Sequence, residues 1–120
     1  MFEQDFIMRQ VEDMTRFLSL LIFGKSSSSE EVDLEEYYGS GEHSLRNTLQ
    51  QMIDEGNING AEDLLFEAIE REPSKGNFAV ALAFYKTLSE LEDEELEAHD
   101  FSRQEIFEGL DAIKAYYLPN

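Results

Sequence analysis

Apolar residues recur along this chain at the spacing of one face of an α-helix. The clearest run lies within residues 59–73, and its apolar positions stand at i, i+3, i+4, i+7 and i+8: Ala61, Leu64, Leu65, Ala68 and Ile69. A similar run occupies residues 45–53, and a segment rich in Gly and Asn separates the two runs. The two runs predict a helical hairpin, in which Gly56 ends the first helix, Asn59 caps the second and Pro73 stops it.

Other segments of the chain carry helical signals as well. Residues 2–23 form a long amphipathic pattern, residues 102–117 open with an S-x-x-E capping box, and residues 32–38 allow one or two helical turns. Residues 77–90 are apolar on every side, which predicts an enclosed central helix. The acidic residues 92–97 either continue this helix or break it. Because no segment alternates like a strand, we predict an all-α fold of five to seven helices, with the hairpin inside a compact bundle.

A serine-rich segment, KSSSSEE, divides the chain at residues 25–31. It predicts three parts: an N-terminal amphipathic helix in residues 1–25, a flexible serine-rich and acidic linker with a short helix in residues 26–42, and a helical domain in residues 43–120. The wide apolar stripe of the first helix needs a partner, which is its own domain, a second copy or a membrane surface. We predict a homodimer through this helix, with these interface candidates: Ile7, Val11, Met14, Phe17, Leu18 and Leu21.

The composition narrows the possible partners. The 120 residues fit one domain, and 27 acidic against 9 basic residues give a net charge of −18. Such a charge repels phosphate backbones, so direct nucleic-acid binding is not expected. No apolar run is long enough for a transmembrane helix, and acidic residues precede the apolar residues 17–23, unlike a secretory signal. We expect a cytoplasmic protein without integral membrane association.

The residues give little sign of catalytic or metal chemistry. The chain has no Cys, and its two histidines, His43 and His99, have no HExxH context. Residues 55–66 resemble a calcium-binding loop, but Phe66 stands where the loop needs a bidentate Glu. We therefore predict no catalytic residue, no metal site and no cofactor, and we expect that the protein is not an enzyme.

Two resemblances add to this interpretation. Residues 45–73 resemble one tetratricopeptide repeat, because Ala61 and Ala68 stand seven apart before Pro73, although Leu49 replaces the small residue of the first helix. This resemblance implies peptide or protein binding in a groove between helices. The opening, MFEQDFIMRQVEDMTRFLSLLIFGK, is similar to short uncharacterised proteins of Gram-positive bacteria that form a domain-of-unknown-function family. That resemblance implies no activity.

These observations favour a non-enzymatic protein–protein interaction module that self-associates. The alternative is an acidic decoy that mimics nucleic acid and occupies a basic site on a DNA-binding protein. A carboxylate-bridged metal protein ranks last. Regularly spaced exposed carboxylates would favour the decoy, whereas a concave apolar groove with a few polar anchors would favour peptide binding.

Overall fold

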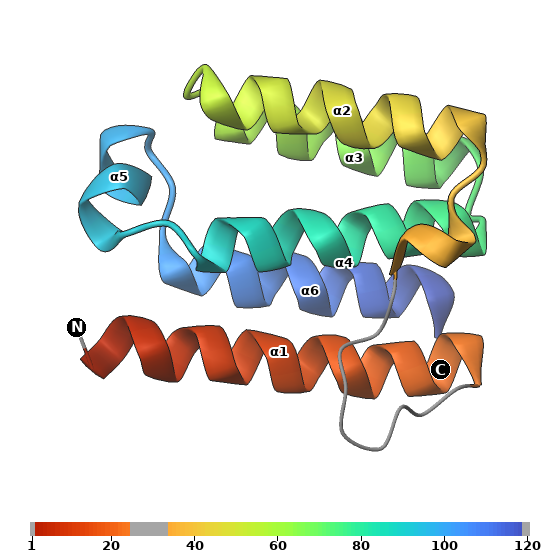
Figure 1. The fold of residues 1–120 in the computed structure, drawn as a ribbon, viewed down its shortest axis with the longest axis horizontal. Helices are drawn as coiled ribbons and strands as arrows, with labels where there is room; N and C mark the ends of the chain where they lie inside the picture. Colours follow the sequence, from red (N-terminus) through yellow and green to blue (C-terminus); the bar gives the residue numbers. More distant parts are fainter. Residues whose placement is uncertain (1, 25–33, 119–120) are drawn as a thin grey trace.

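The computed structural model describes residues 2–24 and 34–118 (Figure 1). Within these ranges the chain forms six α-helices, one short 3₁₀ helix and no strand. Their bounds are α1 Phe2–Phe23, η1 Leu34–Tyr37, α2 Ser40–Asp54, α3 Ile58–Arg71, α4 Lys75–Ser89, α5 Asp93–Ala98 and α6 Arg103–Tyr117. The predicted all-α fold is confirmed, and α1 has the predicted bounds.

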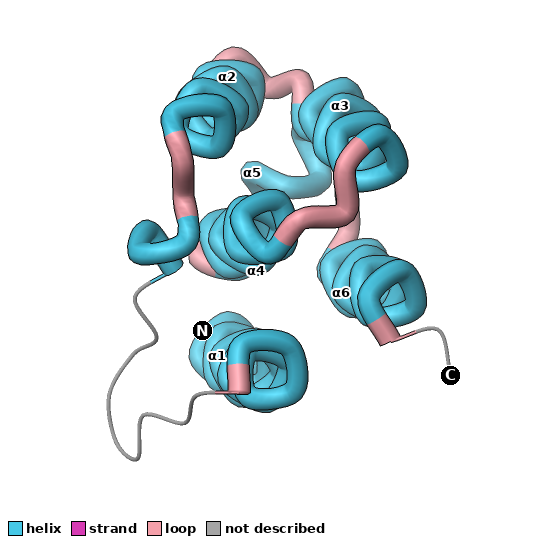
Figure 2. The backbone as a smooth tube through the Cα atoms, turned by 90° about the vertical axis from the view of Figure 1, so that its right-hand side faces the viewer, coloured by secondary structure: helices cyan, strands magenta, loops and turns pink. Residues whose placement is uncertain are grey.

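Helix α4 lies at the centre of the bundle. Seen end-on, it is surrounded by α1, α2, α3 and α6, and it also contacts η1 (Figure 2). Its Phe78, Leu82 and Tyr85 are fully buried, as the apolar pattern on all sides predicts. The helix begins at Lys75 because Ser74 caps it, accepting a hydrogen bond from the backbone N–H of Asn77 at 3.0 Å.

Helices α2 and α3 form the predicted hairpin. Gly56 connects them with a positive φ of 85°, a conformation that residues with a Cβ rarely adopt. The prediction that Asn59 caps α3 is wrong. Asn57 is the cap, because its Oδ1 accepts from the N–H of Gly60, whereas Asn59 lies inside the helix and donates to the carbonyl of Asp100 at 3.1 Å.

The acidic segment after α4 ends that helix and forms the separate short helix α5. The predicted capping box of α6 is present, since Ser102 and Glu105 exchange side-chain to backbone hydrogen bonds. Arg103 then joins three elements. Its guanidinium donates to the Asp93 carboxylate at 2.6 Å and to the carbonyls of Ser89 and Leu91, so the start of α6 is tied to the end of α4 and the start of α5.

Helix α1 packs along α4 and α6 on the side opposite the hairpin (Figure 2). Its Val11 and Leu18 belong to the same hydrophobic core as the rest of the bundle. Part of the predicted linker, residues 26–33, lies outside the described residues. The remainder forms η1 and, from Ser40, the first turn of α2. Of the helices described, none combines the length and the hydrophobicity that crossing a lipid bilayer requires.

Candidate functional site

A hollow of about 500 Å³ lies between α3 and α6, and we call it the acidic groove. It is lined by six carboxylates, two helix residues without large side chains and one aromatic ring: Glu62, Asp63, Glu67, Glu70, Glu105, Glu108, Gly109, Ala112 and Phe66. Helical periodicity explains the arrangement. On α3, Glu62, Phe66 and Glu70 are four residues apart, so they share one face of the helix and line one wall of the groove.

A buried tyrosine of the central helix contacts two of the residues that line the groove, Glu62 and Gly109. Tyr85 on α4 is fully buried, and its Oη donates to Glu62 Oε2 at 2.5 Å. Its ring lies directly against Gly109, where any Cβ would overlap the ring. The sequence of α6 therefore leaves room for the ring by placing a glycine in the middle of the helix, where Gly is otherwise unfavourable.

Burial raises the pKa values of both members of this pair. Desolvation raises the pKa of Glu62 above its usual 4.5, and the carboxylates of Glu105, Asp63 and Glu108 raise that pKa further, while the hydrogen bond from Tyr85 opposes the shift. Burial, and then the bond to the Glu62 carboxylate, raises the pKa of the Tyr85 phenol. At neutral pH the phenol is therefore a hydrogen-bond donor and not a nucleophile.

A second tyrosine joins the two walls of the acidic groove. Tyr116 Oη on α6 donates to Glu70 Oε2 on α3 at 2.6 Å, and the Tyr116 ring lies 6.1 Å from the ring of Phe66. The bond to the Glu70 carboxylate raises the pKa of Tyr116. The groove thus combines strong negative charge with aromatic surface.

The outer face of α1 is the other unusual surface. Four large apolar side chains are exposed there, with exposed fractions of 60% for Phe6, 53% for Phe17, and 44% each for Leu20 and Leu21. Beside them is a hollow of about 560 Å³ between α1 and α6, lined by Gln10, Asp13, Met14, Phe17 and Phe107. Monomeric soluble proteins rarely leave such side chains together on one helix face.

Comparison with known protein families places the chain in one of them. The model of a family of unknown function, DUF6483, matches residues 1–118. The chain belongs to this family. The predicted membership in a domain-of-unknown-function family is confirmed, whereas the origin from Gram-positive bacteria and the likeness to a tetratricopeptide repeat stay predictions. No curated protein and no solved structure matches the chain.

The predicted interface residues of this family member divide into two groups. Val11 and Leu18 are buried in the core, with exposed fractions of 0% and 1%, and Ile7 and Met14 pack partly against it. Phe17 and Leu21 are on the outer face. Phe6 was not among the predicted interface residues, although its spacing of eleven residues from Phe17 places both on one side of a helix.

The two histidines and the calcium-like loop have ordinary structural places. His43 is exposed, with its ring 5.0 Å from that of Tyr38, and His99 caps α5 beside Gly56. In the loop, the oxygen of the Asn57 side chain accepts the N–H of Gly60. In the part of the chain that the structure describes, no three His, Asp or Glu side chains are arranged to hold a metal ion.

Proposed function

We propose that this protein is a non-enzymatic protein–protein interaction module that self-associates through the outer face of α1. The observation that carries the proposal is the exposure of Phe6 and Phe17, each more than half exposed, next to an apolar hollow. Burying aromatic side chains of this size is a main source of binding energy at protein interfaces. The remaining surface of the chain offers no comparable apolar group among the described residues, since the only other large exposed hydrophobic side chain, Tyr116, is hydrogen-bonded to Glu70.

The test is the molar mass of the full chain in solution over a wide range of concentrations. Light scattering coupled to size exclusion should show a mass that rises from monomer toward dimer as the concentration increases. Phe17→Ala should shift that rise to higher concentration, because it removes apolar contact area. Tyr116→Ala is the matched control, an exposed aromatic residue on a different face, and it should leave the association unchanged. A chain that stays monomeric at the highest concentration contradicts the proposal.

The acidic groove supports a second candidate, the acidic decoy. Its six carboxylates line a single concave surface, and a basic segment would be attracted to it over the distance of a Debye length, about 8 Å at physiological salt. The aromatic rings of Phe66 and Tyr116 offer stacking surface to arginine side chains. This candidate predicts binding of an arginine-rich peptide that weakens as salt is added.

A pair of matched variants tests whether the groove, rather than the total charge, attracts the peptide. Glu105→Gln with Glu108→Gln removes two charges from the acidic groove, and Glu94→Gln with Glu95→Gln removes two from α5 outside it. Fluorescence anisotropy with a labelled arginine-rich peptide should show a larger loss of affinity for the first pair. Equal losses for the two pairs would mean that the peptide senses only the overall charge of the protein.

A further inference from the structure

Four residues on the outer face of α1 are spaced symmetrically along the helix. The intervals between them are four, three and four residues, so the order of intervals is the same from either end of the helix: Phe6, Gln10, Asp13 and Phe17. These residues share one side of the helix, and three of them line the hollow beside α6. In two antiparallel copies of α1 related by a twofold axis between residues 11 and 12, Phe6 of each copy faces Phe17 of the other, and Gln10 faces Asp13.

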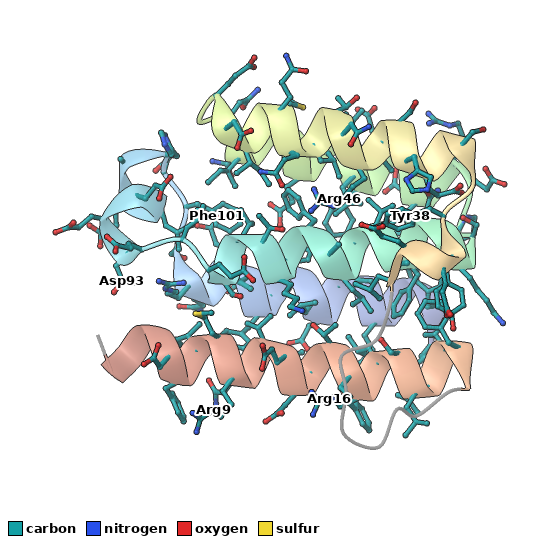
Figure 3. The ribbon with its side chains drawn as sticks, in the orientation of Figure 1. Arg9, Arg16, Tyr38, Arg46, Asp93 and Phe101 are labelled. Carbon is teal, nitrogen blue, oxygen red and sulfur yellow. The ribbon has the colours of Figure 1, made fainter. Side chains whose placement is uncertain are left out.

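The charges next to this series obey the same symmetry. Arg9 and Arg16 project from α1 away from the bundle (Figure 3), on the same flank of the helix as Asp5 and Asp13. In the antiparallel arrangement, Arg9 and Asp13 of the second copy are offset along the helix axis by one residue. Arg16 and Asp5 of the second copy are offset by two residues. The twofold axis doubles each contact, so four pairs of opposite charge flank the apolar contacts.

Charge also explains why a second copy fits this face. Residues 1–25 carry a net charge of −1, whereas the rest of the chain carries −17. Most of that charge belongs to residues 26–60 and 92–120, which carry −7 each, so two copies that met through those segments would bring strongly negative regions together. A basic partner would be drawn to the negative regions rather than to this nearly neutral face, and an anionic membrane would be repelled by the whole molecule.

We infer that two copies of this chain pair through antiparallel α1 helices, with Phe6 packed on Phe17 and Arg9 opposite Asp13 across a twofold axis. This arrangement rests on the self-association proposed above. A helix of 22 residues is about 33 Å long, and the contact is confined to one such helix from each copy. Association through so limited a surface is typical of reversible dimers.

Charge reversal tests the pairing without any assumption about its strength. Arg9→Asp alone places two aspartates opposite each other, and Asp13→Arg alone places two arginines opposite each other, so each variant by itself should dimerise more weakly than wild type. An equal mixture of the two variants restores both pairs of opposite charge between unlike copies. Sedimentation velocity should therefore show more dimer in the mixture than in either variant alone. Within a single helix the mixture restores nothing, so a pairing between residues 9 and 13 of the same copy cannot give this result.

Cross-linking tests the direction of the helices independently, because the chain contains no cysteine. In the antiparallel dimer, the two copies of position 10 are offset by three residues, about 4.5 Å along the helix, and the two copies of position 21 by nineteen residues, about 28 Å. A short bismaleimide should therefore join Gln10→Cys chains and not Leu21→Cys chains. Joining of both variants would indicate parallel helices and overturn the inference.

The outcomes separate the inference from the proposed function. A wild-type chain that remains monomeric at every concentration overturns both, and leaves the outer face of α1 to another protein or to a lipid surface. A wild-type dimer whose mixed charge variants regain no dimer overturns only the antiparallel pairing. Circular dichroism on each variant shows whether the helices are intact, and a variant that unfolds is replaced by Arg9→Gln or Asp13→Asn, each of which should weaken the dimer by removing the cross-dimer pairs.

Discussion

Replacing Gly109 by alanine should destabilise the protein although alanine is the better helix former. Gly109 lies in the middle of α6, and a Cβ there would overlap Oη, Cζ and Cε1 of Tyr85. The ring of Tyr85 is fully buried and is held in place, because Phe84 packs against it at 5.0 Å between ring centroids and Glu62 accepts a hydrogen bond from its hydroxyl. The added methyl group must therefore displace the ring or the helix.

The expected magnitude is the balance of three contributions to the free energy of unfolding. Gly to Ala in a helix interior gains about 1 kcal/mol. Overpacking a core costs typically about 1–3 kcal/mol, and a lost hydrogen bond to a charged group costs roughly 1.5–3 kcal/mol. The net loss is then about 1.5–5 kcal/mol. For 120 residues the unfolding entropy is roughly 250 cal/mol/K, so the melting temperature should fall by about 6–20 °C.

Differential scanning calorimetry on three variants decides whether the contact with Tyr85 is the cause. Gly41→Ala is the matched control, because Gly41 is helical with open space where its Cβ would be added, and its melting temperature should rise by at most about 4 °C. In a Tyr85→Leu background, which lacks the outer ring atoms, Gly109→Ala should cost little or nothing. A Gly109→Ala protein that melts as high as the Gly41→Ala protein would refute the reasoning.

Three further changes have signs fixed by the structure. Ser19→Ala should raise the melting temperature by about 4 °C in calorimetry, because the buried Ser19 hydroxyl has no hydrogen-bond partner in the described structure, while the exposed Ser44→Ala should have little effect. Burial raises the pKa of Glu62 above 4.5 in the folded protein, so the stability that its protonated form contributes is complete below pH 4.5 and is lost as the pH rises through the folded pKa. Glu62→Gln cannot ionise and avoids this loss. In urea denaturation, the variant should therefore be more stable than wild type by a large margin at pH 8, and this margin should shrink toward pH 4.5. Arg103→Lys should lower stability by about 1–2 kcal/mol in the same assay, because one ammonium group cannot serve the three separate acceptors of the guanidinium.

Much of the fold was predictable because helix bounds depend on neighbouring residues. The bounds of α1, the capping box of Ser102 and Glu105, and the enclosure of α4 all follow from spacing within one turn or from hydrophobicity within one segment. The cap of α3 was missed by two residues, because Asn57 and Asn59 have equal capping chemistry. Only the three-dimensional path of the turn decides which of them reaches the N–H of Gly60.

The acidic groove was not predictable, because its two walls come from helices that are distant in sequence. The carboxylates of α3 and α6 are regular on their own helices, and an isolated regular acidic face is most simply a solvated one. The two helices are placed side by side by α4, which packs against both of them. Tyr85 of α4 donates a hydrogen bond to Glu62 on α3 and lies against Gly109 on α6. A single sequence records neither which helices are neighbours nor which faces they turn toward one another.

At four positions of α1, burial is the opposite of what hydrophobicity alone predicts. Ser19 and Thr15 are buried against the bundle without hydrogen-bond partners in the described structure, whereas Phe6 and Phe17 point outward. An unpaired buried hydroxyl lowers the stability of the fold by about 1–3 kcal/mol, and leaving a phenylalanine exposed loses a burial free energy of roughly the same size. Small residues on the inner face let α1 approach α4 closely, and that explains the serine but not the two exposed rings. Sequences depart from local consistency mainly where function requires it. The two phenylalanines, separated by a series that reads the same in both directions, are consistent with a surface that a second copy of the chain completes.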